Sequence, residues 1–225
     1  EVNIFLIPAR SGSVGIKDKN IQLINNQTLI QHAITFSQRC AQQTDKVYIS
    51  TDSIEYERHA LANGALSVGT RHQHLSDSKA RTGDVIVDFF KTAQNIHLNI
   101  RNIILIQPTS PIRTKELFSE CMASAVSTRE VVTTIAKLEE PHPYELLKLA
   151  SENNRIAPFI GEADLSAPRQ SLPKCYFPTG AIYIYPVELI KCGGALDATR
   201  GVLHRDSVNI DTQYDLEIAQ KRMSI

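Results

Sequence analysis

The sequence predicts an α/β fold, a three-layer α/β/α arrangement with a mostly parallel central sheet, in a single domain that spans residues 1–225. Two observations support this fold class. Short apolar segments alternate with amphipathic helical segments through the first half of the chain, which implies right-handed crossovers between parallel strands. The segments at 4–7 and 102–107 show no polar alternation, as is typical of strands that are buried on both faces of a sheet.

Apolar spacing and capping residues place the other elements. Thr28 can cap a helix whose apolar face repeats every three or four residues. A helix after 51–53 has a normal C-terminal signal at 63–64, and residues 212–215 form a capping box for the last helix. We further expect helices around 85–93 and after Thr114, and strands at 47–50, 65–68, 131–135, 181–185 and 208–211.

The regular pattern breaks after Leu138. Residues 139–178 contain six prolines and keep neither a strand period nor a helix period. So long an irregular stretch is improbable inside a compact domain. We interpret it as a small excursion that packs against something else, and a partner subunit is the obvious candidate.

Composition and charge exclude several classes of protein. The 24 basic and 24 acidic residues cancel, which argues against a broad surface for nucleic acid or anionic membrane but leaves room for a local basic pocket. No apolar run approaches the ~20 residues of a membrane span, and the first apolar stretch is too short for a signal sequence. The cysteines show neither metal-ligand spacing nor a dense disulfide framework, so we expect a reducing compartment and a cytoplasmic location. They are Cys40, Cys121, Cys175 and Cys192.

The loop 10–15 (Arg-Ser-Gly-Ser-Val-Gly) follows the first predicted strand, at the edge of the sheet where α/β proteins bind ligands. Its backbone N–H groups and the Arg10 guanidinium could bind an anion. The loop matches neither the Walker pattern nor Gly-x-Gly-x-x-Gly, and a plain tight turn explains its composition about equally well. Lys17 and Lys19 follow closely enough to neutralise phosphates, although both could simply be solvated.

The loop 107–113 (Gln-Pro-Thr-Ser-Pro-Ile-Arg) follows the strongest predicted strand. Its two prolines would hold the polar groups rigidly, with the Gln107 amide in the crevice. A stiff connection with Arg113 as an exposed charge is slightly favoured when this loop is taken alone. Arg169 could clamp a carboxylate through two hydrogen bonds, although a surface arginine is the commoner outcome.

Asp211 resembles half of a Mg²⁺ site, because Mg²⁺ often takes one or two carboxylates together with substrate phosphates. Solvation at a strand end, or a contact to the following helix, is the alternative. Asp215 fits a capping role better than a metal role. The seven histidines fall into no ligand spacing, and no metal is assigned to them.

Four motifs occur in a fixed order between residues 4 and 219. Any one of them is modest evidence, but four in register are strong. They resemble those of the acylneuraminate cytidylyltransferases, which activate sialic acid or its bacterial relatives, legionaminic and pseudaminic acid, with CTP. The motifs are Ile7–Ser13 with Gly15, Lys19 and Asn20; Gln107–Arg113; Pro168–Gln170 with Gly180–Tyr183; and Ile210–Thr212 with Asp215 and Leu216.

The resemblance implies a nucleotide-diphosphosugar transferase (Rossmann-like) fold and a homodimer, with residues 139–177 as an inserted dimerisation segment that closes over the partner's active site. It also implies a Mg²⁺-dependent reaction. The anomeric hydroxyl of a nine-carbon 2-keto sugar acid attacks the α-phosphate of CTP, pyrophosphate leaves, and a CMP-sugar forms.

The same resemblance assigns roles to residues, with Arg10, Lys19 and Asp211 as the catalytic set. Asp211 would bind Mg²⁺ together with Asn209. Residues that would bind the nucleotide are Arg10, Ser11, Gly12, Ser13, Gly15, Lys19, Asn20, Arg71 and Ser78, of which Arg71 and Ser78 would lie near the cytidine. Residues that would bind the sugar acid are Gln107, Arg169, Thr179 and Tyr183.

Three positions depart from the family pattern. Val14 stands where a lysine is usual, Asn209 where an aspartate is usual, and Thr179 where an asparagine is usual. An amide can ligate Mg²⁺ only through a neutral oxygen, so we expect weaker metal affinity. Two alternatives stay open: a catalytically weakened or regulatory nucleotide-binding homologue, and a cytidylyltransferase for an eight-carbon sugar acid.

Overall fold

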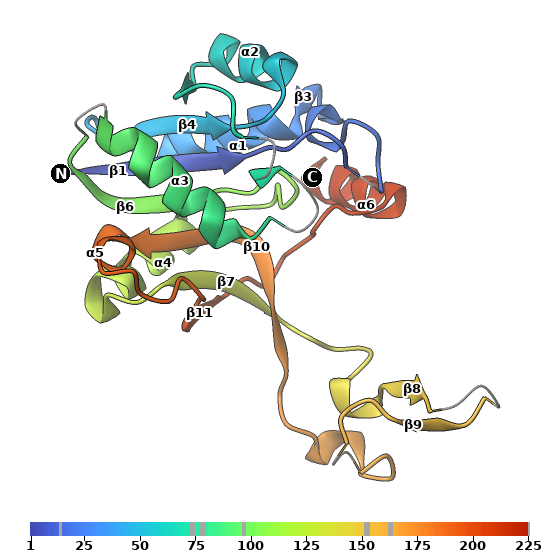
Figure 1. The fold of residues 1–225 in the computed structure, drawn as a ribbon. Helices are drawn as coiled ribbons and strands as arrows, with labels where there is room; N and C mark the ends of the chain where they lie inside the picture. Colours follow the sequence, from blue (N-terminus) through green and yellow to red (C-terminus); the bar gives the residue numbers. More distant parts are fainter. Residues whose placement is uncertain are drawn as a thin grey trace.

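The central sheet is organised around β1 (Val2–Pro8), which pairs in parallel with β6 (Ile100–Leu105) on one side and with β4 (Lys46–Ser50) on the other. This computed structural model describes residues 1–13, 15–72, 75–76, 80–95, 98–150, 154–161 and 164–224. The sheet has seven strands in the order β11-β7-β10-β6-β1-β4-β5 (Figure 1). Its other members are β5 (Leu66–Ser67), β7 (Val132–Lys137), β10 (Tyr176–Pro186) and β11 (Arg200–Leu203).

β10 runs antiparallel to both of its neighbours, β6 and β7, whereas β11 is parallel to β7 and β5 is parallel to β4. Six strands therefore share one direction and one is reversed. The predicted mostly parallel sheet is confirmed, and the two most apolar predicted strands lie side by side at its centre.

Helices cover both faces of the sheet, because successive residues of β1 point to opposite sides. Phe5 and Ile7 pack with the helices of one face, and Ile4 and Leu6 pack with those of the other. The first face carries α1 (Leu29–Cys40), α2 (Ile54–Ala62) and α4 (Lys115–Thr128). The second carries α3 (Thr82–Asn95) and α5 (Val187–Lys191), which completes the predicted three layers (Figure 1).

A smaller apolar cluster joins the two ends of the chain. In it, α6 (Gln213–Met223) packs beside the hairpin of β2 (Leu23–Ile24) and β3 (Gln27–Thr28). The short 3₁₀ helix η1 (Lys19–Ile21) precedes this hairpin. This packing brings the C-terminal helix next to the loop that follows β1.

The predicted helix starts are confirmed. The Thr28 hydroxyl accepts a hydrogen bond from the Gln31 backbone N–H, and the Gln31 side chain accepts one from the Thr28 N–H, so a capping box opens α1. Thr212 and Asp215 form the equivalent box at α6. Ser53 and Thr114 cap α2 and α4, each by accepting a backbone N–H three residues on.

Two strand predictions need correction. Residues 208–211 form no strand; this stretch is tied to the sheet edge by one backbone hydrogen bond, from Ile210 N to Thr109 O at 2.8 Å. The strand in this part of the chain is β11, which the sequence did not indicate because Arg-Gly-Val-Leu is short and lacks flanking signals. β10 also begins at Tyr176 rather than at 181, because Tyr176–Pro178 pair with β7.

Residues 139–177 extend away from the sheet as a projecting segment (Figure 1). It contains an antiparallel hairpin of β8 (Leu147–Leu149) and β9 (Ile156–Pro158), with the 3₁₀ turns η3 (Pro143–Glu145) and η4 (Arg169–Ser171). A hydrogen bond from Leu138 N to Cys175 O (2.9 Å) closes its base, and its last two residues belong to β10.

Within the described part of the chain, no helix combines the length and the apolar character that crossing a membrane requires. Cys40, Cys121, Cys175 and Cys192 are free cysteines, of which Cys121 is buried and Cys192 is exposed.

We expect Thr28→Ala to lower the free energy of unfolding by about 1 kcal/mol, because the first turn of α1 loses its cap. Denaturant unfolding measures this change. Ser119→Ala is the matched control, since the Ser119 hydroxyl is exposed in mid-helix and only bonds back to the Lys115 carbonyl. It should change stability by less than about 0.5 kcal/mol. Equal effects of the two substitutions would contradict the capping assignment.

Candidate active site

A cleft of about 550 Å³ opens at the carboxyl ends of β1 and β6. Among the residues that the structure describes, three cationic side chains and one carboxylate line it: Arg10, Lys19, Arg71 and Asp211. The net charge of this described lining is positive although the whole chain is neutral. The other lining residues are Pro8, Ser13, Gly15, Asn20, Leu75, Ala80, Thr82, Val85, Leu105, Gln107, Pro108, Thr109 and Asn209.

Hydrogen bonds to Asp52 and from Asn20 hold the backbone of the loop after β1 in place. Ser11 donates to Asp52 twice, from its backbone N to Oδ1 and from its hydroxyl to Oδ2, both at 2.8 Å. The buried Asn20 side chain donates to the Arg10 carbonyl at 3.0 Å. Ser11 and Asn20 therefore fix the backbone of the loop, which leaves the Arg10 side chain and Ser13 free to line the cleft.

Gly12 and Gly15 meet two different requirements in this loop. Gly12 has a φ of +71°, a left-handed backbone that side chains disfavour. A Cβ on Gly15 would lie 2.1 Å from the carbonyl oxygen of Asp211, so only glycine permits this approach. The close contact joins the first loop to the stretch before α6.

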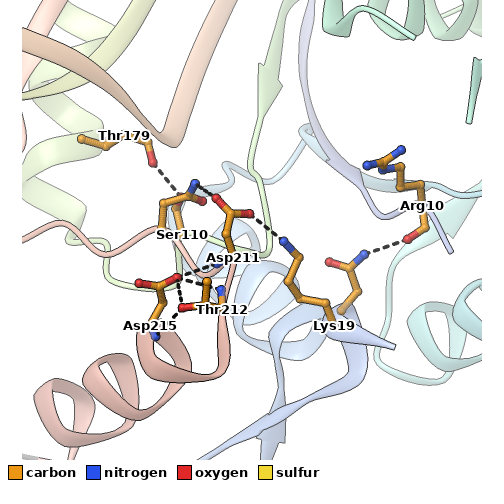
Figure 2. Close-up of polar contacts among 9 residues, drawn as sticks. Arg10, Lys19, Ser110, Thr179, Asp211, Thr212 and Asp215 are labelled. Atoms are coloured by element: carbon orange, nitrogen blue, oxygen red, sulfur yellow. Dashed lines mark hydrogen bonds and ion pairs between the residues drawn. The ribbon is translucent and has the colours of Figure 1, made fainter. Parts of the chain in front are cut away.

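The side chain of Asp211 has partners on both oxygens. Lys19 Nζ lies 2.8 Å from Oδ1, and Asn209 Nδ2 lies 2.9 Å from Oδ2 (Figure 2). Its backbone N–H donates to Asp215 Oδ2 at 3.1 Å, and the same oxygen accepts from Thr212. Burial acts to raise the pKa of Asp215, but these hydrogen bonds outweigh it and hold the pKa below its usual value. The capping role predicted for Asp215 is confirmed.

The amide of Asn209 has a defined orientation. Its Oδ1 faces the Ser110 hydroxyl at 3.4 Å, and that hydroxyl also donates to the Thr179 carbonyl at 2.7 Å (Figure 2). If the amide were turned over, its oxygen would face the Asp211 carboxylate and two acceptors would meet. Asn209 is therefore a hydrogen-bond donor toward Asp211 in this structure.

Arg71 also lines the cleft. Its backbone N donates to the Thr51 carbonyl at 2.7 Å, and its Nε donates to Ser76 Oγ at 3.1 Å. Burial lowers the pKa of Arg71, whereas the nearby Asp52 carboxylate raises it. Ser78 and Val14, which the sequence placed at this site, lie outside the described residues.

The structure separates the four residues predicted to contact the sugar acid. Gln107 lines the cleft, and its Oε1 would lie 2.3 Å from a Cβ on Gly180. Thr179 is buried behind it, within hydrogen-bond distance of Thr134 Oγ1 (2.6 Å) and His204 Nδ1 (3.1 Å). Burial lowers the pKa of His204.

Neither Tyr183 nor Arg169 belongs to the described lining of the cleft. Tyr183 stacks on Tyr185, with ring centroids 6.2 Å apart. Arg169 lies in the projecting segment, where it bonds the Glu140 carboxylate and the Glu139 carbonyl.

The sequence interpretation missed three contributors. Asp52, which lies between β4 and α2, proves to hold Ser11. Ser110 links Thr179 to Asn209. The interpretation of its loop as a stiff connection predicted that Arg113 would be an exposed charge, and this is wrong. Its Nη1 is buried, and its guanidinium donates hydrogen bonds to two backbone carbonyls. A sequence signal for Arg113 exists, since it ends a rigid loop directly after an apolar residue and before a helix cap.

The oxygen donors of the cleft fit a hard cation that arrives together with phosphates. Among the described residues, no group of three or more His, Cys, Asp or Glu side chains could hold a metal ion by itself. The Asp211 side chain is 65% exposed, so its oxygens remain accessible once Lys19 moves aside. Mg²⁺ commonly binds through one or two carboxylates and completes its shell with phosphates and water.

Comparison with known proteins defines the class. The solved structure of a CMP:2-keto-3-deoxy-manno-octonic acid synthetase complexed with CTP superposes with a TM-score of 0.71 at 15% identity, over 100% of this chain and 99% of that one, which shows a shared fold. A family model for cytidylyltransferases matches residues 4–189. The chain belongs to the cytidylyltransferase family, and the resemblance seen in the four motifs is confirmed.

Two relatives show how the similarity is distributed. The chain is 33% identical over 183 residues to the N-acylneuraminate cytidylyltransferase of Streptococcus agalactiae serotype V, which covers 80% of this chain and 42% of that protein. It is 25% identical to the CMP-N,N'-diacetyllegionaminic acid synthase of Legionella pneumophila, over 98% of this chain and 95% of that protein. The chain thus spans less than half the length of the streptococcal relative.

We expect Asn209→Asp to lower the free energy of unfolding by about 1 kcal/mol without divalent cations, because a second carboxylate would replace the N–H donor beside the largely exposed Asp211. Added MgCl₂ should then raise the unfolding temperature of the variant more than that of the parent protein.

Gln213→Glu is the matched control, since it makes the same amide-to-carboxylate change at an exposed position in the first turn of α6. Thermal unfolding with and without MgCl₂ measures both variants. An Asn209→Asp protein that is no less stable than the control without divalent cations would contradict the orientation assigned to Asn209.

Proposed function

We propose that this protein transfers the cytidylyl group of CTP to a sialic-acid-like (nonulosonic) sugar acid, giving a CMP-sugar and pyrophosphate. One observation carries the proposal: among the described residues, three cations and a single carboxylate gather at the carboxyl ends of β1 and β6, around a glycine-containing loop. The site offers charge for a triphosphate and hydrogen bonds for a polar acceptor. Relatives from Streptococcus agalactiae and Legionella pneumophila bear names that describe such chemistry.

The nucleotide half of the site consists of Arg10, Lys19 and Arg71 with the backbone of the first loop. Phosphoryl transfer requires mainly that in-line atoms be positioned and that spreading negative charge be neutralised. Arg10 and Lys19 would contact the triphosphate, and Arg71 would lie near the cytidine. Because Asp52 and Asn20 already hold the loop backbone, little reorganisation is needed when the nucleotide binds.

Asp211 would hold Mg²⁺ in this proposal, with the triphosphate completing the coordination shell. The ion would supply further charge neutralisation and polarise the phosphate under attack. Asn209 could ligate through its oxygen only by turning its amide away from Asp211, so its first role is to orient the carboxylate. With Lys19 drawn to the phosphates, the Asp211 carboxylate or a water bound to the ion would accept the proton of the acceptor hydroxyl.

The acceptor half would begin at Gln107, with Tyr183 and Thr179 behind it and Arg169 supplied by another subunit. Both ends of the projecting segment connect to the sheet at the edge that carries the cleft, because β7 leaves and β10 enters there. Leu149 and Ile156 are paired across its hairpin and are 71% and 62% exposed. We propose that residues 139–177 pack against a second copy of the chain in a homodimer and carry Arg169 toward that copy's cleft.

The function is tested by incubating the protein with CTP, MgCl₂ and a panel of sugar acids, with pyrophosphate release and product mass as readouts. The panel contains N-acetylneuraminic, legionaminic and pseudaminic acid and the eight-carbon 3-deoxy-manno-octulosonic acid. We expect turnover with a nine-carbon acid, and at least about 100-fold slower turnover in Asp211→Asn, because the carboxylate is lost while its size is kept.

Other outcomes separate the alternatives. Turnover with the eight-carbon acid alone would identify a different acceptor class. Binding of CTP by calorimetry without turnover of any acid would identify a nucleotide-binding homologue that has lost activity. Recovery of turnover in Asn209→Asp would then assign that loss to the substituted carboxylate.

The homodimer is tested by light scattering coupled to size-exclusion chromatography. We expect a dimer for the parent protein and a monomer for the double variant Leu149→Lys, Ile156→Lys, because four charges per dimer would enter an apolar contact. Leu23→Lys is the control: Leu23 is 53% exposed and lies in the β2–β3 hairpin. A parent protein that is monomeric at micromolar concentration would exclude the proposed role of the segment.

A further inference from the structure

Arg113 has an unusual environment for a permanent cation. Its Nε donates to the Ala181 carbonyl at 3.0 Å, and its Nη2 donates to the Gln107 carbonyl. The guanidinium lies over the Phe36 ring, 5.6 Å from the centroid, and its Nη1 is buried with no hydrogen-bond partner among the described residues.

This environment opposes the charge. Burial lowers the pKa of Arg113 to about 9, although the Cys40 thiol acts weakly in the other direction. Removing a cation from water is unfavourable unless its N–H groups find new hydrogen-bond acceptors. One of the three guanidinium nitrogens, Nη1, has no acceptor among the described residues. An arginine at this position therefore contributes little to the stability of the fold. Its role is better inferred from the two carbonyls that it binds, those of Gln107 and Ala181.

The two carbonyls lie opposite each other. β6 and β10 pair with Leu105 facing Tyr183, and extending that register by two residues places Gln107 opposite Ala181. The strand β6 ends at Leu105, so regular pairing has stopped at this point. The Arg113 guanidinium therefore joins these two backbone segments at the point where they begin to separate.

Gln107 is also confined from its other side. Gly180 has a φ of +73°, and a Cβ there would come within 2.3 Å of Gln107 Oε1 and 3.1 Å of Ser110 Oγ. The Gln107 amide thus lies against the bare backbone of Gly180 while its own backbone is held by Arg113. No cationic residue of the nucleotide half takes part in these contacts.

We propose that Arg113 is a positioning residue that fixes the Gln107 amide in the cleft and so controls affinity for the acceptor substrate, with little influence on affinity for CTP. This inference rests on the function proposed above, in which Gln107 faces the acceptor. It assigns a role to a residue that touches neither substrate.

Arg113→Lys tests the inference, because lysine keeps the charge but cannot span two carbonyls with a rigid fork. We expect the KM for the best acceptor of the sugar-acid panel to rise about fivefold to tenfold, the equivalent of about one hydrogen bond, while the KM for CTP and kcat change less than twofold. Arg101→Lys is the control, since Arg101 is exposed at the other end of β6.

A second readout does not depend on turnover. In ¹⁵N-labelled protein, the Gln107 side-chain NH₂ resonance, assigned by its loss in Gln107→Glu, should shift in Arg113→Lys and stay in place in Arg101→Lys. These two measurements remain possible if no acid is turned over. A shifted Gln107 resonance together with an unchanged affinity for CTP by calorimetry would then support the positioning role of Arg113 even though the proposed function had failed.

Gly180→Ala perturbs the Gln107 amide from the opposite side and should raise the same KM and shift the same resonance. It carries the test if Arg113→Lys does not accumulate as folded protein. The inference is overturned if a folded Arg113→Lys protein leaves both the resonance and the acceptor KM unchanged, or raises the two KM values equally.

Discussion

The contact between the loop after β1 and Asp211 is the constraint on which the site depends. Gly15 lets the Asp211 carbonyl approach the loop, and Lys19 pairs with the Asp211 carboxylate at 2.8 Å. α6 supports this contact from behind through its capping box and through its packing beside the β2–β3 hairpin. Without the contact, the cleft would retain its cations but lose its one described carboxylate. The sheet, the loop after β1 and α6 therefore together fix the position of the Asp211 carboxylate.

The reversed strand β10 brings Gly180 against Gln107, a residue that lines the cleft. Because it runs against its neighbours, its first residues lie at the edge where parallel strands end, and Gly180 can meet Gln107 there. The same reversal sends the projecting segment out from that edge. A single change of strand direction therefore accounts for both the contact between Gly180 and Gln107 and the position of the proposed dimer contact.

Local signals predicted the fold and half of the site. β1 and β6 were recognisable because both of their faces are buried, and Thr28, Thr114 and Thr212 were recognisable because caps act within one turn. The grouping of Arg10, Gln107 and Asp211 followed from the rule that loops at one sheet edge meet, and Lys19 from its place just after the first of these loops, whereas Arg71 was indicated by the family resemblance alone. These features depend on short-range patterns that a sequence displays directly.

The features that the sequence did not display depend on contacts between distant residues. Arg113 resembles any loop arginine until β10 brings the Ala181 carbonyl to it. The predicted strand at 208–211 is extended but finds only one backbone partner, Thr109, so the apolar pattern was present without a neighbouring strand to pair with. The orientation of Asn209 likewise requires Ser110, which is far away in sequence. Tertiary partners decide such cases, as expected for short elements.

The Lys19–Asp211 pair joins residues that are 192 positions apart in the chain. Contacts of such separation close the largest loops and form only after the intervening elements have taken their places. During synthesis, Arg10, Lys19 and Arg71 leave the ribosome long before Asp211 does. Until then the basic loops lack the carboxylate with which Lys19 pairs in the folded protein. The site is therefore complete only when the stretch before α6 packs against the loop that follows β1.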